Sequence, residues 1–326
     1  CVVENLEQPE KMKWDGSEIR FIRPIRWLVC LLGEDTIPLK IGEQVAGNIT
    51  VGHRFLSPGK IEIQRPSKYK SLLKENYVLV DPDERKNSLI DQAKNIAEDF
   101  GAELQSENTF LTMLSNSLEY PTAVKGKFPE EYLDLPPVLL NNTLRKQARL
   151  IPTCDEKGKP KPLFIAFRDG EEDDDGFVRK GYESVIKSRL RDTQFFFEND
   201  RSKNLANYTS QLKQITFQQD LGTVWDKVAR IRQLANYIQK ETGLSEDKTV
   251  DRAAFLCKAD LATEIVDEYP KLQGEIGAIY SELDGENEEV VEGIKEHYRP
   301  ESSKDSPPAS ETGIIISIAD KLDTLM

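Results

Sequence analysis

The sequence has no long apolar run. Its longest apolar stretches, Trp27–Leu32 and Ile314–Ile318, are much shorter than the ~18 residues that a membrane-spanning helix requires. We therefore expect no membrane partner. Cys1 is not followed by a basic segment and an apolar stretch, so a secretory signal peptide is not expected. A helical pattern that runs to Met326 predicts that the chain is a fragment of a longer polypeptide.

Cysteine and histidine are scarce, which limits disulfide and metal chemistry. The cysteines form no CxxC pair, which argues against a disulfide framework and against a zinc knuckle. The absence of a disulfide pattern favours a reducing, cytoplasmic location. The two histidines, His53 and His297, are predicted to be structural rather than catalytic. The four cysteines are spread along the chain, at Cys1, Cys30, Cys154 and Cys257.

The motifs of common nucleotide-binding and hydrolytic sites are also missing. The sequence contains no GxxxxGKS/T or GxGxxG phosphate loop, no GxSxG nucleophile turn and no HExxH zinc motif. The residues alone therefore predict no catalytic site. The net charge of −13 argues against binding driven by a globally basic protein. A negative net charge is nevertheless compatible with RNA binding through a local basic face.

Composition and periodicity predict an α+β region followed by an all-α region. Up to residue 170, strand-like and helical patterns mix without strict βαβ alternation, which favours an α+β fold. Residues 171–205 are predicted to form an acidic loop and a linker helix, and 206–326 a helical domain. We predict strands over 19–32, 36–41, 48–53, 60–64, 77–80 and 122–126, a hairpin tip over 155–162, and helices over 66–76, 82–100, 137–148, 181–203, 224–242, 252–269, 288–297 and 313–325.

Three short basic segments are candidates for RNA contact. The first has arginines at every third position beside aromatic residues, which suits phosphate contacts and base stacking. Residues 179–203 hold seven basic and four acidic residues, a local excess of three positive charges. The alternative is an ordinary solvated surface, with Trp27 buried in an edge strand. The candidates are Arg20, Arg23, Arg26, Arg145, Lys146, Arg149, Arg179, Lys180 and Arg189.

Two aspartates occupy inward positions of apolar helical patterns. Asp260 and Asp320 each follow an apolar residue by four positions. A buried carboxylate is costly unless it is paired or binds a metal. The pattern therefore predicts either a metal or phosphate site, or aspartates neutralised by a neighbour such as Lys258 or Lys321.

A series of sequence blocks, in order along nearly the whole chain, resembles a known family. The blocks are Met12–Trp14, Phe21–Leu28, Gly52–Pro58, Leu118–Ala123, Val178–Glu183, Arg189–Phe196, Phe217–Lys227, Cys257–Glu264, Leu272–Gly274, Glu296–Tyr298 and Ala319–Asp323. Together they resemble the beta subunit of bacterial heterotetrameric glycyl-tRNA synthetase. No single block is specific to that family, but the ordered set is.

The resemblance implies an alpha2-beta2 enzyme, glycine–tRNA ligase, that joins glycine to its tRNA using ATP and Mg²⁺. In that family the aminoacylation centre lies on the alpha subunit, and the beta subunit binds and positions tRNA. The implied partners are the alpha subunit, glycine tRNA and a second beta subunit. We therefore expect this chain to hold no catalytic residue and no cofactor, to be inactive alone, and to lack the family's C-terminal anticodon-binding region.

The resemblance also implies the fold of each region. Residues 1–170 look similar to the α+β modules of the phenylalanyl-tRNA synthetase beta subunit, and 206–326 to an HD-type helical domain. Active HD phosphohydrolases bind metal through a distant His, an adjacent His-Asp pair and a late Asp. Cys257 and Lys258 stand at the position of the pair, and only the late Asp remains, as Asp320. Because a lysine repels a divalent cation, we expect no metal at this degenerate site.

Other functions remain open at this point. The main alternative is hydrolytic: an HD-type metal-dependent phosphohydrolase, or an editing deacylase in the N-terminal region. A third possibility is that the chain mainly holds subunits together, which is compatible with tRNA binding.

Overall fold

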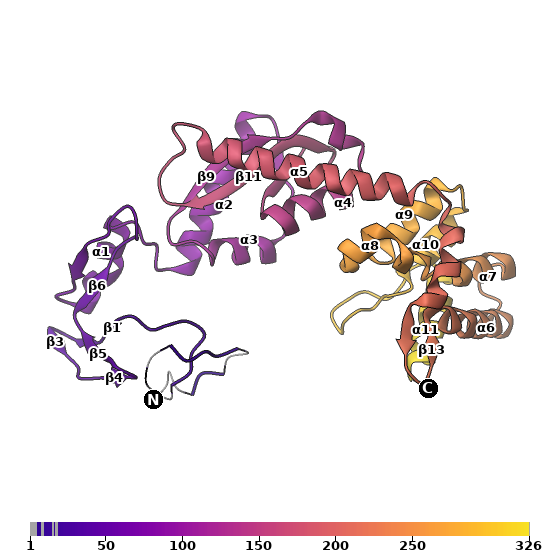
Figure 1. Ribbon diagram of the computed structural model, residues 1–326, viewed down its shortest axis with the longest axis horizontal. Helices are drawn as coiled ribbons and strands as arrows, with labels where there is room; N and C mark the ends of the chain where they lie inside the picture. The colour runs from indigo at the N-terminus through magenta and orange to yellow at the C-terminus, as the bar shows by residue number, and fades with distance from the viewer. Residues whose placement is uncertain (1–4, 8–9, 15, 17–18, 326) are drawn as a thin grey trace. The chain divides into compact units, whose positions relative to one another are not determined.

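The computed structural model describes residues 5–7, 10–14, 16 and 19–325, and it divides into two compact units (Figure 1). The first unit ends at Ser188 and the second begins at Arg189. Helix α5 (Phe177–Asp200) therefore starts in one unit and finishes in the other. None of the helices in the described part of the chain combines the length and apolarity that a membrane crossing requires.

The first unit opens with short strands joined by tight turns. Strand β5 pairs in parallel with β1 and antiparallel with β4, while β2–β3 and β6–β7 form two separate antiparallel pairs. The predicted strand over 19–32 is reduced to two short pieces, in part because Pro24 has no N–H to donate to a ladder. The elements are β1 (Leu28–Val29), β2 (Leu31–Leu32), β3 (Asp35–Thr36), β4 (Lys40–Ile41), β5 (Gln44–Gly47), β6 (Ile49–Val51), β7 (Lys60–Glu62), a 3₁₀ turn (Pro66–Lys68) and α1 (Tyr69–Glu75).

The predicted strand over 77–80 is wrong. Tyr77 has a φ of 60°, and the carbonyls of Leu79 and Val80 accept hydrogen bonds from the Arg85 guanidinium. Leu79 N–H donates to the Glu119 carbonyl, but no ladder of strand hydrogen bonds extends along the segment. The side chain of Arg85 therefore takes the place that a neighbouring strand would occupy.

A four-stranded antiparallel sheet forms the centre of the first unit. Its order is β8-β10-β11-β9, and β11 pairs with β9 from Leu163↔Lys127 to Asp169↔Pro121. The predicted hairpin tip over 155–162 is confirmed over residues 155–159, which connect β10 and β11, whereas residues 160–162 already belong to β11. The strands are β8 (Glu103–Leu104), β9 (Pro121–Lys127), β10 (Ile151–Cys154) and β11 (Pro160–Asp169).

Helices cover this sheet and close its core. The predicted helix over 82–100 is confirmed as α2, where Asp81 accepts from two backbone N–H groups at the N-terminus and a face of Leu89, Ala93 and Ala97 packs against the strands. Helix α5 is tied to the strands because the Tyr182 hydroxyl donates to the Phe167 carbonyl. The helical segments are α2 (Pro82–Asp99), α3 (Asn108–Ser115), a 3₁₀ segment (Glu130–Asp134), α4 (Pro137–Asn142) and a π-helical turn (Thr143–Gln147).

The second unit is mainly helical. Helix α6 packs on α7 and α11, and α10 packs on α7, α9 and α11. Thr223 and Asp226 form a capping box at the start of α6, and Gly243 ends that helix with a φ of 68°. The elements are a 3₁₀ segment (Leu205–Gln214), β12 (Thr216–Gln218), β13 (Gly222–Thr223), α6 (Val224–Thr242), α7 (Asp247–Leu256), 3₁₀ turns (Ala259–Ala262, Pro270–Leu272), α8 (Glu264–Glu268), α9 (Glu275–Leu283), α10 (Glu288–Glu296) and α11 (Glu311–Leu325).

Three details of this unit differ from the sequence predictions. The expected helix over 252–269 breaks after Leu256 and resumes as the short α8, because the intervening turn directs Lys258 and Asp260 into the interior. Helix α9 was not predicted. The unit is also not purely helical, since β12 and β13 form a two-stranded antiparallel ribbon. The prediction of an HD-type arrangement stays a prediction.

Candidate functional site

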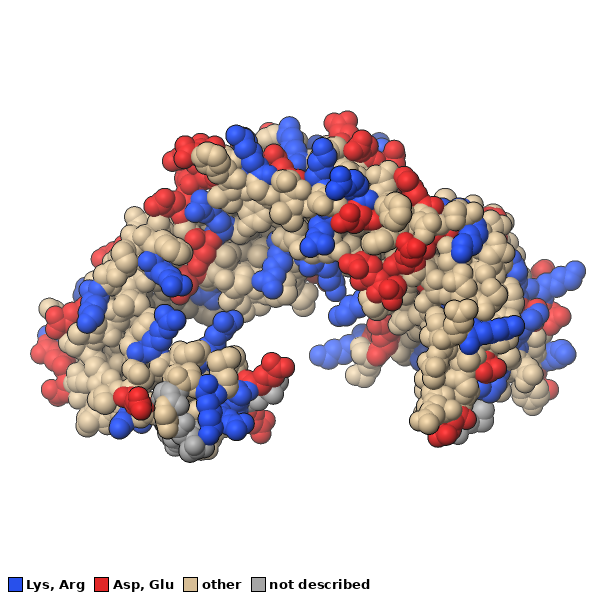
Figure 2. Space-filling model, in the orientation of Figure 1, with Lys and Arg blue, Asp and Glu red and all other residues tan. Residues whose placement is uncertain are grey.

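The predicted RNA-contacting residues lie at three places on the surface. Arg20, Arg23 and Arg26 are in the irregular segment before β1, Lys146 and Arg149 are in or just after the π-helical turn, and Arg179, Lys180 and Arg189 are on α5. All eight are exposed, and none has an ion pair among the described residues. On the visible face, Lys and Arg gather in small groups with Asp and Glu between them, one group lying over α5 (Figure 2).

Arg145 differs from the other candidates because its guanidinium is already engaged. It forms an ion pair with Glu107, with Nη1 3.2 Å from Oε1, and it donates from Nη2 to the Gln105 carbonyl at 2.5 Å. These contacts fasten the π-helical turn to the start of α3. Arg145 therefore stabilises the local fold, whereas the exposed side chains of Lys146 and Arg149 are accessible to a ligand.

The first unit contains a cavity of about 700 Å³ with three arginines in its wall. Arg26 and Arg54 are exposed at its edge, whereas Arg85 is held by main-chain carbonyls. Trp27, which the alternative interpretation placed in a buried edge strand, is 46% exposed and lines the same cavity. Sequence analysis selected Arg26 but missed Arg54, which lies within the Gly52–Pro58 block.

His53, Glu119 and Asp169 are the three groups that lie within metal-binding distance of one another in the described part of the chain. The hydrogen bonds of His53 do not suit a metal ligand, because its Nδ1 accepts from the N–H groups of Phe55 and Leu56 at 3.3 and 3.2 Å. In the neutral form of the ring the proton is therefore on Nε2, which faces Asp169 Oδ1 at 3.5 Å. Neither nitrogen offers a free lone pair.

This histidine instead joins two parts of the first unit. Asp169 Oδ1 also accepts from the N–H groups of Glu119 and Tyr120, at 2.9 and 2.7 Å. The loop that carries His53 is thus connected to the adjacent ends of β9 and β11. The prediction that His53 is structural agrees with this geometry.

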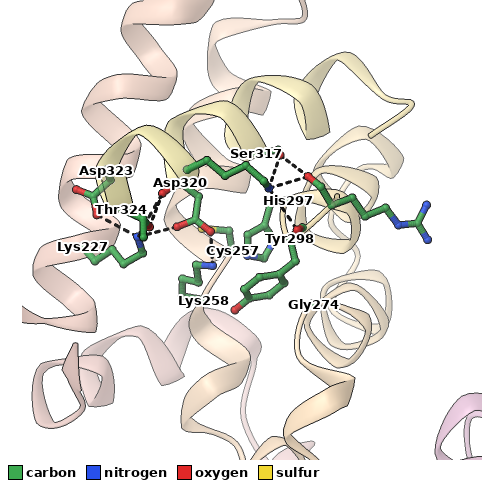
Figure 3. Close-up of polar contacts among 12 residues, drawn as sticks. Lys227, Cys257, Lys258, Gly274, His297, Tyr298, Ser317, Asp320, Asp323 and Thr324 are labelled. Carbon is green, nitrogen blue, oxygen red and sulfur yellow. Dashed lines mark hydrogen bonds and ion pairs between the residues drawn. The ribbon is translucent and has the colours of Figure 1, made fainter. Parts of the chain in front are cut away.

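Lys258 and Asp320, which the resemblance assigns to an HD-type site, lie in a buried ionic cluster of the second unit (Figure 3). Asp320 of α11 contacts Lys258 Nζ at 2.7 Å through Oδ2 and Lys227 Nζ at 2.8 Å through Oδ1. Lys227 also contacts Asp323 at 3.0 Å. The Lys258 ammonium lies 3.6 Å from the centre of the Tyr298 ring, which adds a cation–π contact.

Both oxygens of Asp320 are therefore occupied by lysine ammonium groups. Burial would raise the pKa of this carboxyl, but Lys258 and Lys227 outweigh burial and lower the pKa to about 2. Of the two neutralising partners predicted from sequence, Lys258 makes the contact. Lys321 donates instead to the carbonyls of Tyr298 and Arg299.

Two further buried groups near this cluster are kept uncharged. His297 Nδ1–H donates to the Ile294 carbonyl at 2.6 Å, and burial together with Lys258 holds the pKa of the imidazole well below its usual value. Burial raises the pKa of the Cys257 thiol to about 12, so this thiol is not a nucleophile near neutral pH. Sequence analysis missed Lys227 and Asp323, although Lys227 ends the Phe217–Lys227 block.

A family model described as the glycyl-tRNA synthetase beta subunit matches residues 1–326. The chain belongs to this family. The glycine–tRNA ligase beta subunit of Oceanobacillus iheyensis is 37% identical over 326 residues, which cover 99% of this chain and 47% of that protein. The beta subunits of Syntrophomonas wolfei and Moorella thermoacetica are 38% and 39% identical, each over 100% of this chain and 47% of the relative. The chain thus spans about half the length of these relatives.

Three of the blocks that resemble this beta-subunit family meet at the cavity of the first unit. Phe21–Leu28 contributes Arg26 and Trp27, Gly52–Pro58 contributes Arg54, and Leu118–Ala123 contributes Leu118 and Glu119. The same blocks supply His53 and the Glu119 N–H that contacts Asp169. Segments that are far apart in the sequence therefore build one surface.

Proposed function

We propose that this chain is a tRNA-binding and subunit-assembly part of glycine–tRNA ligase, and that the aminoacylation centre and the sites for ATP and Mg²⁺ lie on the alpha subunit. The observation that carries the proposal is the set of exposed basic side chains that have no ion pair among the described residues, on a chain of net charge −13. Phosphate neutralisation depends on local positive charge, and arginine suits it because its donors form a planar fork. Membership of the beta-subunit family supports RNA as the polyanion.

The hydrolytic alternatives gain no support from the geometry. In the second unit, two ammonium groups occupy the oxygens of Asp320 that an HD-type site would need for its metal. In the first unit, the one cluster of metal-binding type among the described residues includes a histidine without a free lone pair. We therefore do not propose a phosphohydrolase or an editing deacylase.

Binding of tRNA is expected to depend strongly on salt. A handful of phosphate contacts predicts a loss of affinity of roughly tenfold to a thousandfold between low and physiological salt. Arg149→Glu and Arg189→Glu should each weaken tRNA binding. Each should also reduce the slope of the logarithm of the binding constant against the logarithm of the salt concentration by about the amount expected for one phosphate contact. Fluorescence anisotropy with labelled glycine tRNA at several salt concentrations measures both quantities.

Lys94→Glu is the matched control for these charge reversals, because Lys94 is exposed on α2 of the first unit and lies outside the three basic groups. It changes net charge equally and should leave the affinity close to that of the unaltered chain. A folded chain that binds no tRNA at low salt would overturn the proposed function.

Assembly with the alpha subunit is the second part of the proposal. The chain alone should form no glycyl-adenylate from glycine, ATP and Mg²⁺, and mixing it with the alpha subunit should give a larger species in size-exclusion chromatography. We propose that a second beta subunit completes an alpha2-beta2 complex in the cytoplasm. Adenylate formation by the isolated chain, measured by ATP–pyrophosphate exchange, would contradict this placement of the catalytic centre.

A further inference from the structure

The arginine-lined cavity of the first unit has the size and chemistry of a ligand site. Its volume of about 700 Å³ lies within the roughly 300–1,000 Å³ range of small-molecule pockets. Strand β6, helix α1 and the segments 78–80 and 118–119 form its walls. Because all of the described lining residues belong to the first unit, this chain forms the cavity without a partner.

Among the described residues, no ion pair neutralises the exposed positive charge at the cavity. Arg26 and Arg54 are exposed and have no ion pair among the described residues, although Arg54 lies against the Phe55 ring. Arg85 also reaches the wall, with its Nε donating to the Ser115 carbonyl at 2.8 Å. Among the described residues of the lining, Glu119 is the single carboxylate. A phosphate is a ligand that the two free guanidinium groups are suited to bind.

An aromatic surface stands beside these arginines. The indole Nε1–H of Trp27 donates to Thr50 Oγ1 at 3.2 Å, which holds the ring while 46% of the residue remains exposed. Trp27 and Tyr69 also line an adjoining cavity of about 490 Å³, together with apolar residues such as Ile63. A ring that is already held in place loses little freedom when a base stacks on it.

We propose that this cavity binds one unpaired nucleotide of an RNA, with its phosphate on Arg26 and Arg54 and its base stacked on Trp27. The inference rests on the proposed tRNA-binding function and specifies that this cavity binds an unpaired nucleotide. A run of acidic side chains would satisfy the arginines but offers no planar group to stack on the held, exposed face of Trp27. A nucleotide uses both features at once.

The test compares a short unstructured RNA oligonucleotide with intact tRNA, using fluorescence anisotropy at low salt. Trp27→Ala is expected to weaken oligonucleotide binding by roughly 5-fold to 150-fold, the range typical for loss of one base–aromatic stack. Arg54→Ala should weaken it as well, whereas Lys60→Ala, an exposed charge on β7 outside the lining, should not. Trp27→Phe retains an aromatic face and should restore most of the affinity, which separates stacking from loss of the fold.

Tryptophan fluorescence supplies a direct readout of contact. The chain has three tryptophans, and quenching by the oligonucleotide should be lost in Trp27→Phe if the base lies on that ring. Unchanged oligonucleotide and tRNA binding by Trp27→Ala and Arg54→Ala would overturn this inference and leave the proposed function standing. Absence of any RNA binding by the unaltered chain would overturn both. If the variants lost binding to the alpha subunit and kept RNA binding, the cavity would be a protein interface and the inference would be wrong.

Discussion

Replacing Lys258 with methionine is expected to lower the free energy of unfolding of the second unit by about 3–5 kcal/mol. Lys258 is 3% exposed, and its ammonium contacts Asp320 and the Tyr298 ring. The substitution removes one of the two cations that neutralise Asp320 and leaves the carboxylate buried. Urea unfolding monitored by Trp225 measures the effect, in a background where Trp14 and Trp27 are phenylalanine so that only the second unit reports.

Lys248→Met is the matched control for this experiment. Lys248 is an exposed residue of α7, so its replacement should change the unfolding free energy by no more than about 0.5 kcal/mol. The double variant Lys258→Met/Asp320→Asn should be less destabilised than the sum of the two single variants, because the charges act on each other. Additive effects would show that the contact between Lys258 and Asp320 does not contribute to stability.

Acidification is expected to destabilise the second unit through His297. Burial and Lys258 hold the pKa of folded His297 well below its usual value, while the unfolded residue has a pKa of about 6.5. The stabilisation that the second unit gains from burying neutral His297 is therefore fully present above pH 6.5. Below it the unfolded chain binds one more proton than the folded chain, so the unfolding free energy falls by about 1.4 kcal/mol per pH unit. Asp320 and Lys321 also face the ring, and Asp320 partly opposes the shift.

Asp260 contributes with the opposite sign and must be separated from His297. Burial raises the pKa of Asp260 to about 6, although the N–H groups of Gly274 and Gly277 act against burial. Between pH 6 and about 4, Asp260 is protonated in the folded chain and ionised in the unfolded chain. Its contribution to the unfolding free energy therefore increases as the pH falls through this range. The two effects cancel in part over that range, so a profile of the unaltered chain alone does not isolate His297.

The variant His297→Gln isolates the histidine, because glutamine retains an N–H donor for the Ile294 carbonyl and does not titrate. The difference in unfolding free energy between the unaltered chain and His297→Gln should fall by about 1.4 kcal/mol per pH unit below pH 6.5. Chemical denaturation across pH 7.5 to 5 measures this difference. A constant difference would show that His297 titrates equally in the folded and unfolded states.

Secondary structure was predictable where a long segment has one clear period. Helix α2 shows the reason, since Asp81 caps it and its apolar residues recur at helical spacing over 18 residues. The region before β6 has no such period, because its apolar runs, the longest being Trp27–Leu32, are short and are bounded by prolines, glycines and charged residues. The break after Leu256 was also hidden, since the helical pattern continues through residues that the fold turns inward.

The basic candidates show the limit of local patterns for finding a site. Arg145 and Arg149 belong to one sequence cluster, yet Arg145 is bound to Glu107 and Arg149 is exposed. No feature of the cluster itself distinguishes them. Arg54 was not selected, because it lies outside any basic run and lines the same cavity as Arg26 only in the folded unit.

The order of the family blocks and the charge composition of this chain follow from sequence alone, since both are properties of the residues in line. Only the tertiary structure decided which charges are neutralised and which remain available. Lys258 and Asp320 are 62 positions apart, and their pairing depends on how α7 and α11 pack. Arg26 and Arg54, which have no ion pair among the described residues, likewise come from segments that meet only on folding. Burial and pairing are set by contacts between distant segments, which a local pattern does not contain.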